Sequence, residues 1–161
     1  VAMRAIFPVL FVALLCACAS RPRGDVRFDE YFDFANVKKL AFAVDPPSRA
    51  QAPDDVKAVR AIARGEIEQA LTAKGYHFVD EAGEADLLVG YALGTFAKPR
   101  LSGRSSWGTL AGIEIDFIDS KHSDLVWSGW ASLTYRESEM DPKIEVSRIV
   151  AYILEEFPPE R

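Results

Sequence analysis

The chain has 161 residues, of which 27% are charged and 49% hydrophobic, and its formal net charge is −5 at pH 7. This length predicts a single domain, and the acidic balance argues against a nucleic acid as a partner. Both cysteines, Cys16 and Cys18, lie near the N-terminus. The rest of the chain therefore offers no disulfide, no thiolate metal site and no cysteine nucleophile.

The N-terminal segment has the order of a bacterial export signal. Arg4 precedes an apolar run over residues 5–15, and Pro8 lies inside that run. The run is shorter than the roughly 18–20 residues that a membrane-spanning helix requires, and a proline weakens such a helix. We therefore predict that residues 1–17 are a removable signal peptide.

The end of this segment predicts how the chain is cut. Leu15-Cys16-Ala17-Cys18 resembles a lipobox, whose last cysteine carries a diacylglycerol on its sulfur and becomes the first residue. The alternative is Ala17-Cys18-Ala19, an ordinary signal-peptidase site that would release a soluble periplasmic protein beginning at Ser20. We favour lipid attachment at Cys18, because an aliphatic residue stands at the required spacing. Residues 18–27 are then a short lipidated tether.

The residue after the cysteine indicates which membrane holds the protein. Ala19 stands there, and by resemblance to Gram-negative sorting rules the absence of aspartate favours the outer membrane. Each buried CH₂ group of an attached acyl chain contributes about 0.8 kcal/mol, so two or more chains make a stable anchor. We expect a domain in the periplasm that is joined to the membrane through the covalent lipid.

Residues 28–161 are predicted to form one α+β domain. Alternating apolar residues between turn signals predict strands, and apolar residues at helical spacing predict helices. The strands are expected at 37–44, 76–79, 85–97, 109–119 and 125–135, and the helices from Asp54 or Asp55 to Gly75 and from Asp141 to Phe157. The order β-α-β-β-β-β-α favours a mostly antiparallel sheet of four to five strands with both helices packed on one face.

The last two strands alternate clearly and are expected to pair as a hairpin. In the first of them, Ile113, Ile115 and Phe117 share one side of the strand, and Glu114 and Asp116 share the other. This pattern predicts a core side and a solvated side.

Two tryptophans fall on opposite faces of the last strand. Trp127 shares its side with Leu125, which is the expected core side. Trp130 is then placed on the face that the helices leave uncovered, where an exposed aromatic ring marks a docking or ligand surface. The alternative is that Trp130 packs under the segment 28–34 or the loop 98–108.

Several segments, taken in order, resemble one bacterial family. They are the lipobox, the aromatic and acidic segment 28–34, Ala85-Asp86-Leu87-Leu88-Val89, Ile115-Asp116-Phe117-Ile118-Asp119, Leu125-Val126-Trp127-Ser128-Gly129-Trp130-Ala131, and a terminal amphipathic helix closing on Phe157-Pro158-Pro159. The ordered set is similar to the bacterial lipoproteins known as domain of unknown function 4136. The resemblance implies an α+β domain at the outer membrane and carries over no functional residue. The turn at 120–124 departs from the family, whose members usually carry a glycine there.

The loop 98–108 holds a local cluster of basic and aromatic residues in an acidic protein. The cluster consists of Lys98, Arg100, Arg104 and Trp107. Such residues could contact lipid headgroups, lipopolysaccharide phosphates or an acidic protein of the envelope. The alternative is a solvated loop without a partner.

No pattern in the chain predicts catalysis. The serines of the loop lack the spacing of a nucleophile elbow, and no glycine-rich phosphate loop is present. His77 and His122 lie in different predicted elements, and Glu114 and Asp116 are typical of a solvated sheet face. We therefore expect a binding or structural module with no catalytic residue, metal or cofactor. A small hydrolase or transferase, and a carrier of an apolar ligand between sheet and helices, are the alternatives.

Overall fold

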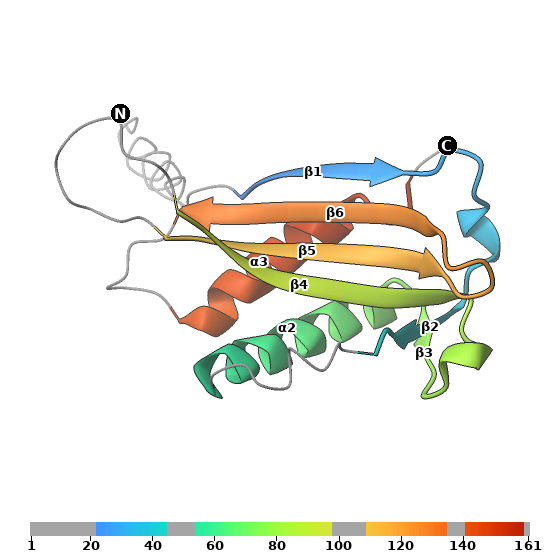
Figure 1. Cartoon of the computed structure of the whole chain (residues 1–161), viewed down its shortest axis with the longest axis horizontal. Helices are drawn as coiled ribbons and strands as arrows, with labels where there is room; N and C mark the ends of the chain where they lie inside the picture. The colour runs from blue at the N-terminus through green and yellow to red at the C-terminus, as the bar shows by residue number, and fades with distance from the viewer. Residues whose placement is uncertain (1–21, 45–53, 98–108, 135–140, 160–161) are drawn as a thin grey trace, which may run out of the picture.

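Figure 1 shows the chain in a computed structural model, which describes residues 22–44, 54–97, 109–134 and 141–159. These ranges contain strands, two α-helices and two short 3-10 helices. The strands are β1 (Arg23–Phe28), β2 (Lys39–Phe42), β3 (His77–Phe78), β4 (Leu87–Ala97), β5 (Thr109–Asp119) and β6 (Leu125–Thr134). The helices are η2 (Phe34–Asn36), α2 (Asp54–Ala73), η3 (Ala82–Glu84) and α3 (Pro142–Glu155).

The described strands form one six-stranded sheet in the order β1-β6-β5-β4-β2-β3. The pairs β1–β6, β6–β5 and β5–β4 are antiparallel, whereas β2 runs parallel to β3 and to β4. The α+β class, the mostly antiparallel sheet and the hairpin of β5 with β6 are therefore confirmed. The sheet has six strands where four to five were expected.

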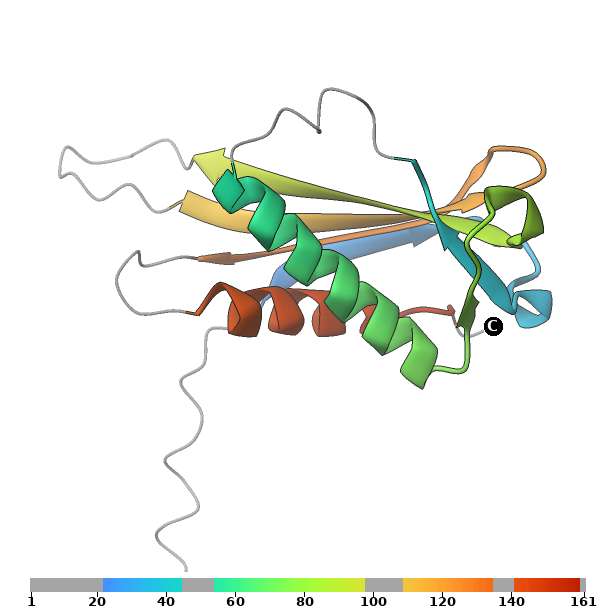
Figure 2. The same cartoon turned by 90° about the horizontal axis from the view of Figure 1, so that it is seen from below.

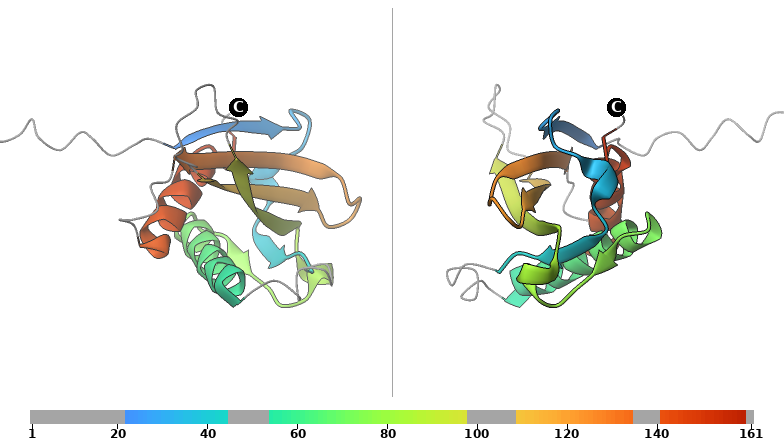
Figure 3. Two further views of the ribbon diagram at one scale, coloured as in Figure 1. Left: turned by 60° about the vertical axis from the view of Figure 1, so that its left-hand side comes forward. Right: turned by 90° about the vertical axis from the view of Figure 1, so that its right-hand side faces the viewer.

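The additional strand is β1, which lies at one edge of the sheet (Figure 3). We expected residues 18–27 to be a tether, but Arg23–Phe28 pair with β6. The strand is rich in charged residues, and Val26 is its one side chain packed against the core. An edge strand with so little buried surface has almost no apolar alternation, which is why the sequence pattern did not reveal it.

Both helices cover the same face of the sheet, as predicted (Figure 2). Helix α2 buries Ala63, Ile67 and Leu71, which recur at helical spacing along one side. Helix α3 begins at Asp141, whose carboxylate accepts a hydrogen bond from Lys143 N at 2.9 Å and so caps the helix. Gly75 follows α2 with a positive φ of 93°, a conformation that favours glycine.

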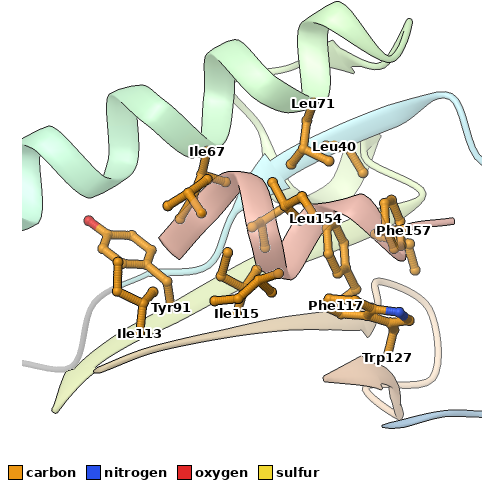
Figure 4. Packing of buried hydrophobic residues seen from close by; sticks show 14 of the residues in the cluster. Leu40, Ile67, Leu71, Tyr91, Ile113, Ile115, Phe117, Trp127, Leu154 and Phe157 are labelled. Carbon is orange, nitrogen blue, oxygen red and sulfur yellow. The ribbon is translucent and has the colours of Figure 1, made fainter. Parts of the chain in front are cut away.

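The core between helices and sheet is centred on aromatic rings (Figure 4). Phe117 of β5 stacks on Phe157, with ring centroids 3.9 Å apart. Trp127 of β6 meets both rings edge-on, at 5.3 and 5.4 Å. All three side chains are fully buried, so the C-terminal end of the chain is packed into the sheet.

One detail of β6 differs from the simple alternation. We expected Leu125 to share the core side with Trp127, but Leu125 is 58% exposed and Val126 is buried. The cause is an irregularity in the ladder, because Phe117 pairs with Trp127 while the next residue, Ile118, pairs with Leu125. Val126 is the extra residue of a β-bulge, and such a bulge changes which residues face the core.

Candidate functional site on the open sheet face

Trp130 is a predicted site residue that the structure describes. Its side chain is 43% exposed, whereas Trp127 on the core face of the same strand is fully buried. The expectation that the two rings lie on opposite faces is confirmed. The other predicted site residues lie outside the described part of the chain: Cys18, Lys98, Arg100, Arg104 and Trp107.

Trp130 lies between two carboxylates across the sheet. It pairs with Asp25 of β1 on one side and with Glu114 of β5 on the other. Directly paired side chains have Cβ atoms about 4.5–5.5 Å apart. Asp25 is also within 3.5 Å of Arg27 Nε, an exposed ion pair that contributes little to stability. Arg23 and Arg27 lie on the same face of β1 as Asp25, so the β1 side of the ring carries both signs of charge. The β5 side, at Glu114, is acidic.

A shallow hollow lies beside Trp130, because the neighbouring positions are small. Ala92 of β4 pairs with Glu114, and Gly94 of β4 pairs with Gly112 of β5. These residues and Trp130 contribute to the lining of a hollow of about 150 Å³. Since glycine has no side chain, a ligand group can approach the backbone here.

Asp116 extends the negative charge along β5. It pairs with Gly90 of β4 and Ser128 of β6, and it lies on the same face as Glu114, as the alternation predicted. Its Oδ1 atom is buried and has no hydrogen-bond partner among the described residues. A buried oxygen without a partner costs free energy, so a donor from a bound molecule would stabilise it.

This arrangement is suited to a positively charged group. The quadrupole of an indole ring attracts an ammonium or guanidinium group within about 6 Å of the ring centroid. A neighbouring carboxylate adds a charge-assisted hydrogen bond. Trp130 and Glu114 offer these two interactions next to each other, on the face opposite α2 and α3.

The described residues bring the two histidines to separate places. His77 lies on β3, and His122 lies in the turn between β5 and β6, where its Nδ1 contacts Asp119 Oδ2. This hydrogen bond, together with one from Lys121 N at 3.0 Å, lowers the pKa of the Asp119 carboxyl. In the part of the chain that the structure describes, no group of three or more His, Cys, Asp or Glu side chains could hold a metal ion.

Sequence reasoning found Trp130 but missed its neighbours. Asp25 was assigned to the tether, so its pairing with Trp130 was not foreseen. The hollow was missed because it depends on the register between β4 and β5. The sequence does carry a signal for the hollow, since Gly90, Ala92 and Gly94 place a small residue at every second position from 90 to 94 of β4.

These features define an α+β domain in which one sheet face is covered by two helices and the other carries an aromatic and acidic surface. The chain belongs to the family of domain of unknown function DUF4136, whose model matches residues 25–159. The resemblance drawn from the sequence motifs is therefore confirmed. Among the described residues, no helix combines the length and the hydrophobicity that crossing a membrane would require.

Solved structures with a similar fold include three bacterial proteins. A PDZ domain protein from Parabacteroides distasonis has a TM-score of 0.62 and 17% identity over 88% of this chain, which spans 38% of that protein. PelC from Paraburkholderia phytofirmans, a dodecamer, has a TM-score of 0.53 and 14% identity, covering 87% of this chain and 99% of that one. A DUF4136 family protein from Bacteroides thetaiotaomicron has a TM-score of 0.53 and 10% identity, covering 87% and 97%. At these identities the likeness concerns the fold alone. Among curated proteins, no sequence matches the chain.

Proposed function

We propose that this chain is a lipid-anchored protein of the bacterial outer membrane whose domain acts in the periplasm as a binding module. Cys18 carries the lipid, and residues 1–17 are removed during export. The single observation that carries the binding role is the ring of Trp130. It is 43% exposed between Asp25 and Glu114, on the face of the sheet opposite α2 and α3.

The partner that fits this face is a protein segment rich in lysine or arginine. The basic group would lie over Trp130 and donate a hydrogen bond to Glu114. Asp116 offers a further acceptor one row along β5. Removal of residues 1–17 takes Arg4 away and changes the net charge from −5 to −6, which adds a long-range attraction for a basic partner.

The alternative functions have less support. A carrier would hold its apolar ligand between the sheet and the helices, and that space contains the packed rings of Phe117, Trp127 and Phe157. A hydrolase or transferase would need a nucleophile hydrogen-bonded to a base. The buried Oδ1 of Asp116, the carboxylate paired with Ser128, has no hydrogen-bond partner among the described residues. The loop residues Lys98, Arg100, Arg104 and Trp107 are a second candidate surface, for an acidic envelope protein or lipopolysaccharide.

Photo-crosslinking in living cells tests the binding face. A photoreactive phenylalanine analogue in place of Trp130 is expected to capture one protein, and capture should be lost when Glu114→Lys is added. The matched control is the same analogue in place of Tyr31, an aromatic residue that is 95% exposed outside the sheet. Equal capture from both positions would contradict the proposed face.

The anchor is tested separately by metabolic labelling with palmitate. The wild-type protein should incorporate label, and Cys18→Ser should not. If mass spectrometry finds a mature protein that begins at Ser20 and carries no acyl group, the anchor is wrong while the binding face still stands.

A further inference from the structure

A second surface, on the helix side of the domain, lies where the chain enters the fold. Helix α3 and the C-terminal end of α2 form a wide, shallow groove of about 650 Å³ whose lining is mostly apolar. Its lining includes Pro22, Ala73, Lys74, Arg148, Ala151 and Tyr152. Pro22 immediately precedes β1, and β1 begins beside α3 (Figures 2 and 3). The groove is therefore next to the proposed tether.

The length of the tether limits how far this groove can be from the lipid. Pro22 is four residues after Cys18. An extended chain spans at most about 3.5 Å per residue, so the two Cα atoms are within about 14 Å of each other. A domain of this size has a radius of gyration of about 14 Å. Because the tether is no longer than that radius, the surface around Pro22 has to face the membrane that holds Cys18.

Two surfaces meet at Pro22, and they differ in chemistry. The open-face side of β1, opposite Val26, is charged, with Arg23, Asp25 and Arg27 all exposed. The groove is mostly apolar, and the polar residues of its lining are Tyr152, Lys74, Arg148 and Glu155. Aliphatic surface bordered by tyrosine and lysine is typical of groups that lie at a bilayer interface. The groove is therefore the better match for a phospholipid surface.

We infer that the groove between α2 and α3 rests on the phospholipid surface of the membrane. This orientation rests on the proposed anchor at Cys18. The bilayer interface covers the apolar lining, and Lys74 lies at the level of the phosphates. The helices then stand between the membrane and the sheet. As a consequence, the open face with Trp130 points into the periplasm, where a protein partner can reach it.

Fluorescence quenching by labelled lipids tests this orientation in the full-length lipidated protein. Single cysteines are introduced by Ala151→Cys in the groove, Glu114→Cys on the open face and Lys121→Cys in the turn between β5 and β6, all at exposed positions. Each is the only free thiol, because Cys18 carries the lipid and Cys16 leaves with the signal peptide. A fluorophore is attached, and the protein is placed in vesicles of phosphatidylethanolamine and phosphatidylglycerol with a nitroxide on the headgroup.

Quenching is expected to be several-fold stronger at position 151 than at positions 114 and 121. Stronger quenching at position 114 or 121, or equal quenching at all three, would overturn the inference. So would weak quenching everywhere in protein that mass spectrometry shows to be lipidated, because the domain would then stand clear of the bilayer. A label at position 151 that is shielded in a concentration-dependent way without lipid would assign the groove to a second copy. An unlipidated product would instead overturn the anchor itself.

Discussion

The two faces of the sheet are built from the same three long strands and differ in almost every other respect. On the helix side, β5 and β6 supply Ile113, Ile115, Phe117 and Trp127, all buried. On the opposite side, the same strands supply Glu114, Asp116 and the half-exposed Trp130. Packing against α2 and α3 accounts for the residues of the first face. Packing accounts for none of the charges on the second.

The difference shows which face of the sheet has residues that stability alone does not explain. A buried aromatic ring lowers the free energy of the folded state by leaving water, so its presence needs no ligand to explain it. A large ring beside carboxylates on a solvated face gains much less from folding. For this reason the open face, and not the larger aromatic cluster in the core, is the candidate binding surface.

Replacing the two tryptophans of β6 gives the largest contrast between the faces. Trp127→Ala removes a fully buried side chain and is expected to lower the free energy of unfolding by about 3–5 kcal/mol. Trp130→Ala is expected to change it by no more than about 0.5 kcal/mol, because the ring is on a solvated surface. Urea unfolding followed by circular dichroism measures both. A large loss in Trp130→Ala would mean that this ring serves the fold.

Trp127→Phe serves as the control for the core variant. The Nε1–H group of Trp127 is buried without a hydrogen-bond partner among the described residues. Phenylalanine keeps an aromatic ring there and removes this unsatisfied donor. The loss of stability should therefore be clearly smaller than for Trp127→Ala.

Two glycines provide the next contrast. A Cβ atom at Gly129 would lie 2.8 Å from Ile153 Cγ2 and closer still to the ring of Trp127. Gly129→Ala is therefore expected to destabilise the fold by about 1–3 kcal/mol through overpacking. At Gly90, on the open face, the nearest atom would be Asp116 Cβ at 3.7 Å, an ordinary contact. Gly90→Ala should leave the urea midpoint unchanged or slightly raised, and a drop as large as that of Gly129→Ala would contradict the assignment of faces.

The part of the fold that could be predicted from the sequence is the part with strong alternation. Strands β5 and β6 alternate because one face is buried, and their hairpin follows directly. Strand β1 could not be found, because it is an edge strand with one side chain packed against the core. The bulge at Val126 could not be predicted either, because Leu125, Val126 and Trp127 are all apolar and the sequence does not show which of them is the extra residue.

The candidate site was predictable only in part, for a related reason. Trp130 could be placed on the open face from its distance along β6 to Trp127. Its carboxylate neighbours, Asp25 and Glu114, come from strands whose register is set by pairing across the sheet. Pairing across strands is a property of the tertiary structure, so the aromatic and acidic row appears only once the sheet is assembled.

Asp86 is a polar residue that is expected to stabilise the fold without contributing to the open face. Its Oδ2 atom accepts hydrogen bonds from Lys38 N and Lys39 N, both at 2.8 Å, and so ties the start of β4 to the start of β2. Burial acts to raise the pKa of this carboxyl, but these two hydrogen bonds, together with the charges of Lys121 and Lys39, lower the pKa below its ordinary value. Asp86→Asn is expected to cost about 1 kcal/mol at neutral pH.

The pH dependence of that loss follows from the sign of the shift. A lowered pKa means that the carboxylate stabilises the folded state above the ordinary aspartate pKa of about 3.9, and that this contribution disappears as the pH falls through the native pKa. The difference in unfolding free energy between wild type and Asp86→Asn should therefore shrink below about pH 4. Asp124→Asn, at an exposed aspartate of the β5–β6 turn, is the matched control. If the difference in unfolding free energy between wild type and Asp86→Asn stays constant in acid, the ionised carboxylate is not its source.

A small gain in stability is expected on the solvent side of the helix layer, at Gly65 in the middle of α2. The residue is exposed, and a Cβ atom there would meet no atom within 4 Å. Glycine in a helix costs about 1 kcal/mol relative to alanine, because its backbone loses more freedom on folding. Gly65→Ala should therefore raise the unfolding free energy by about 0.5–1 kcal/mol. A decrease instead would show that the surface of α2 around Gly65 is closely packed against another group, as the core face is around Gly129.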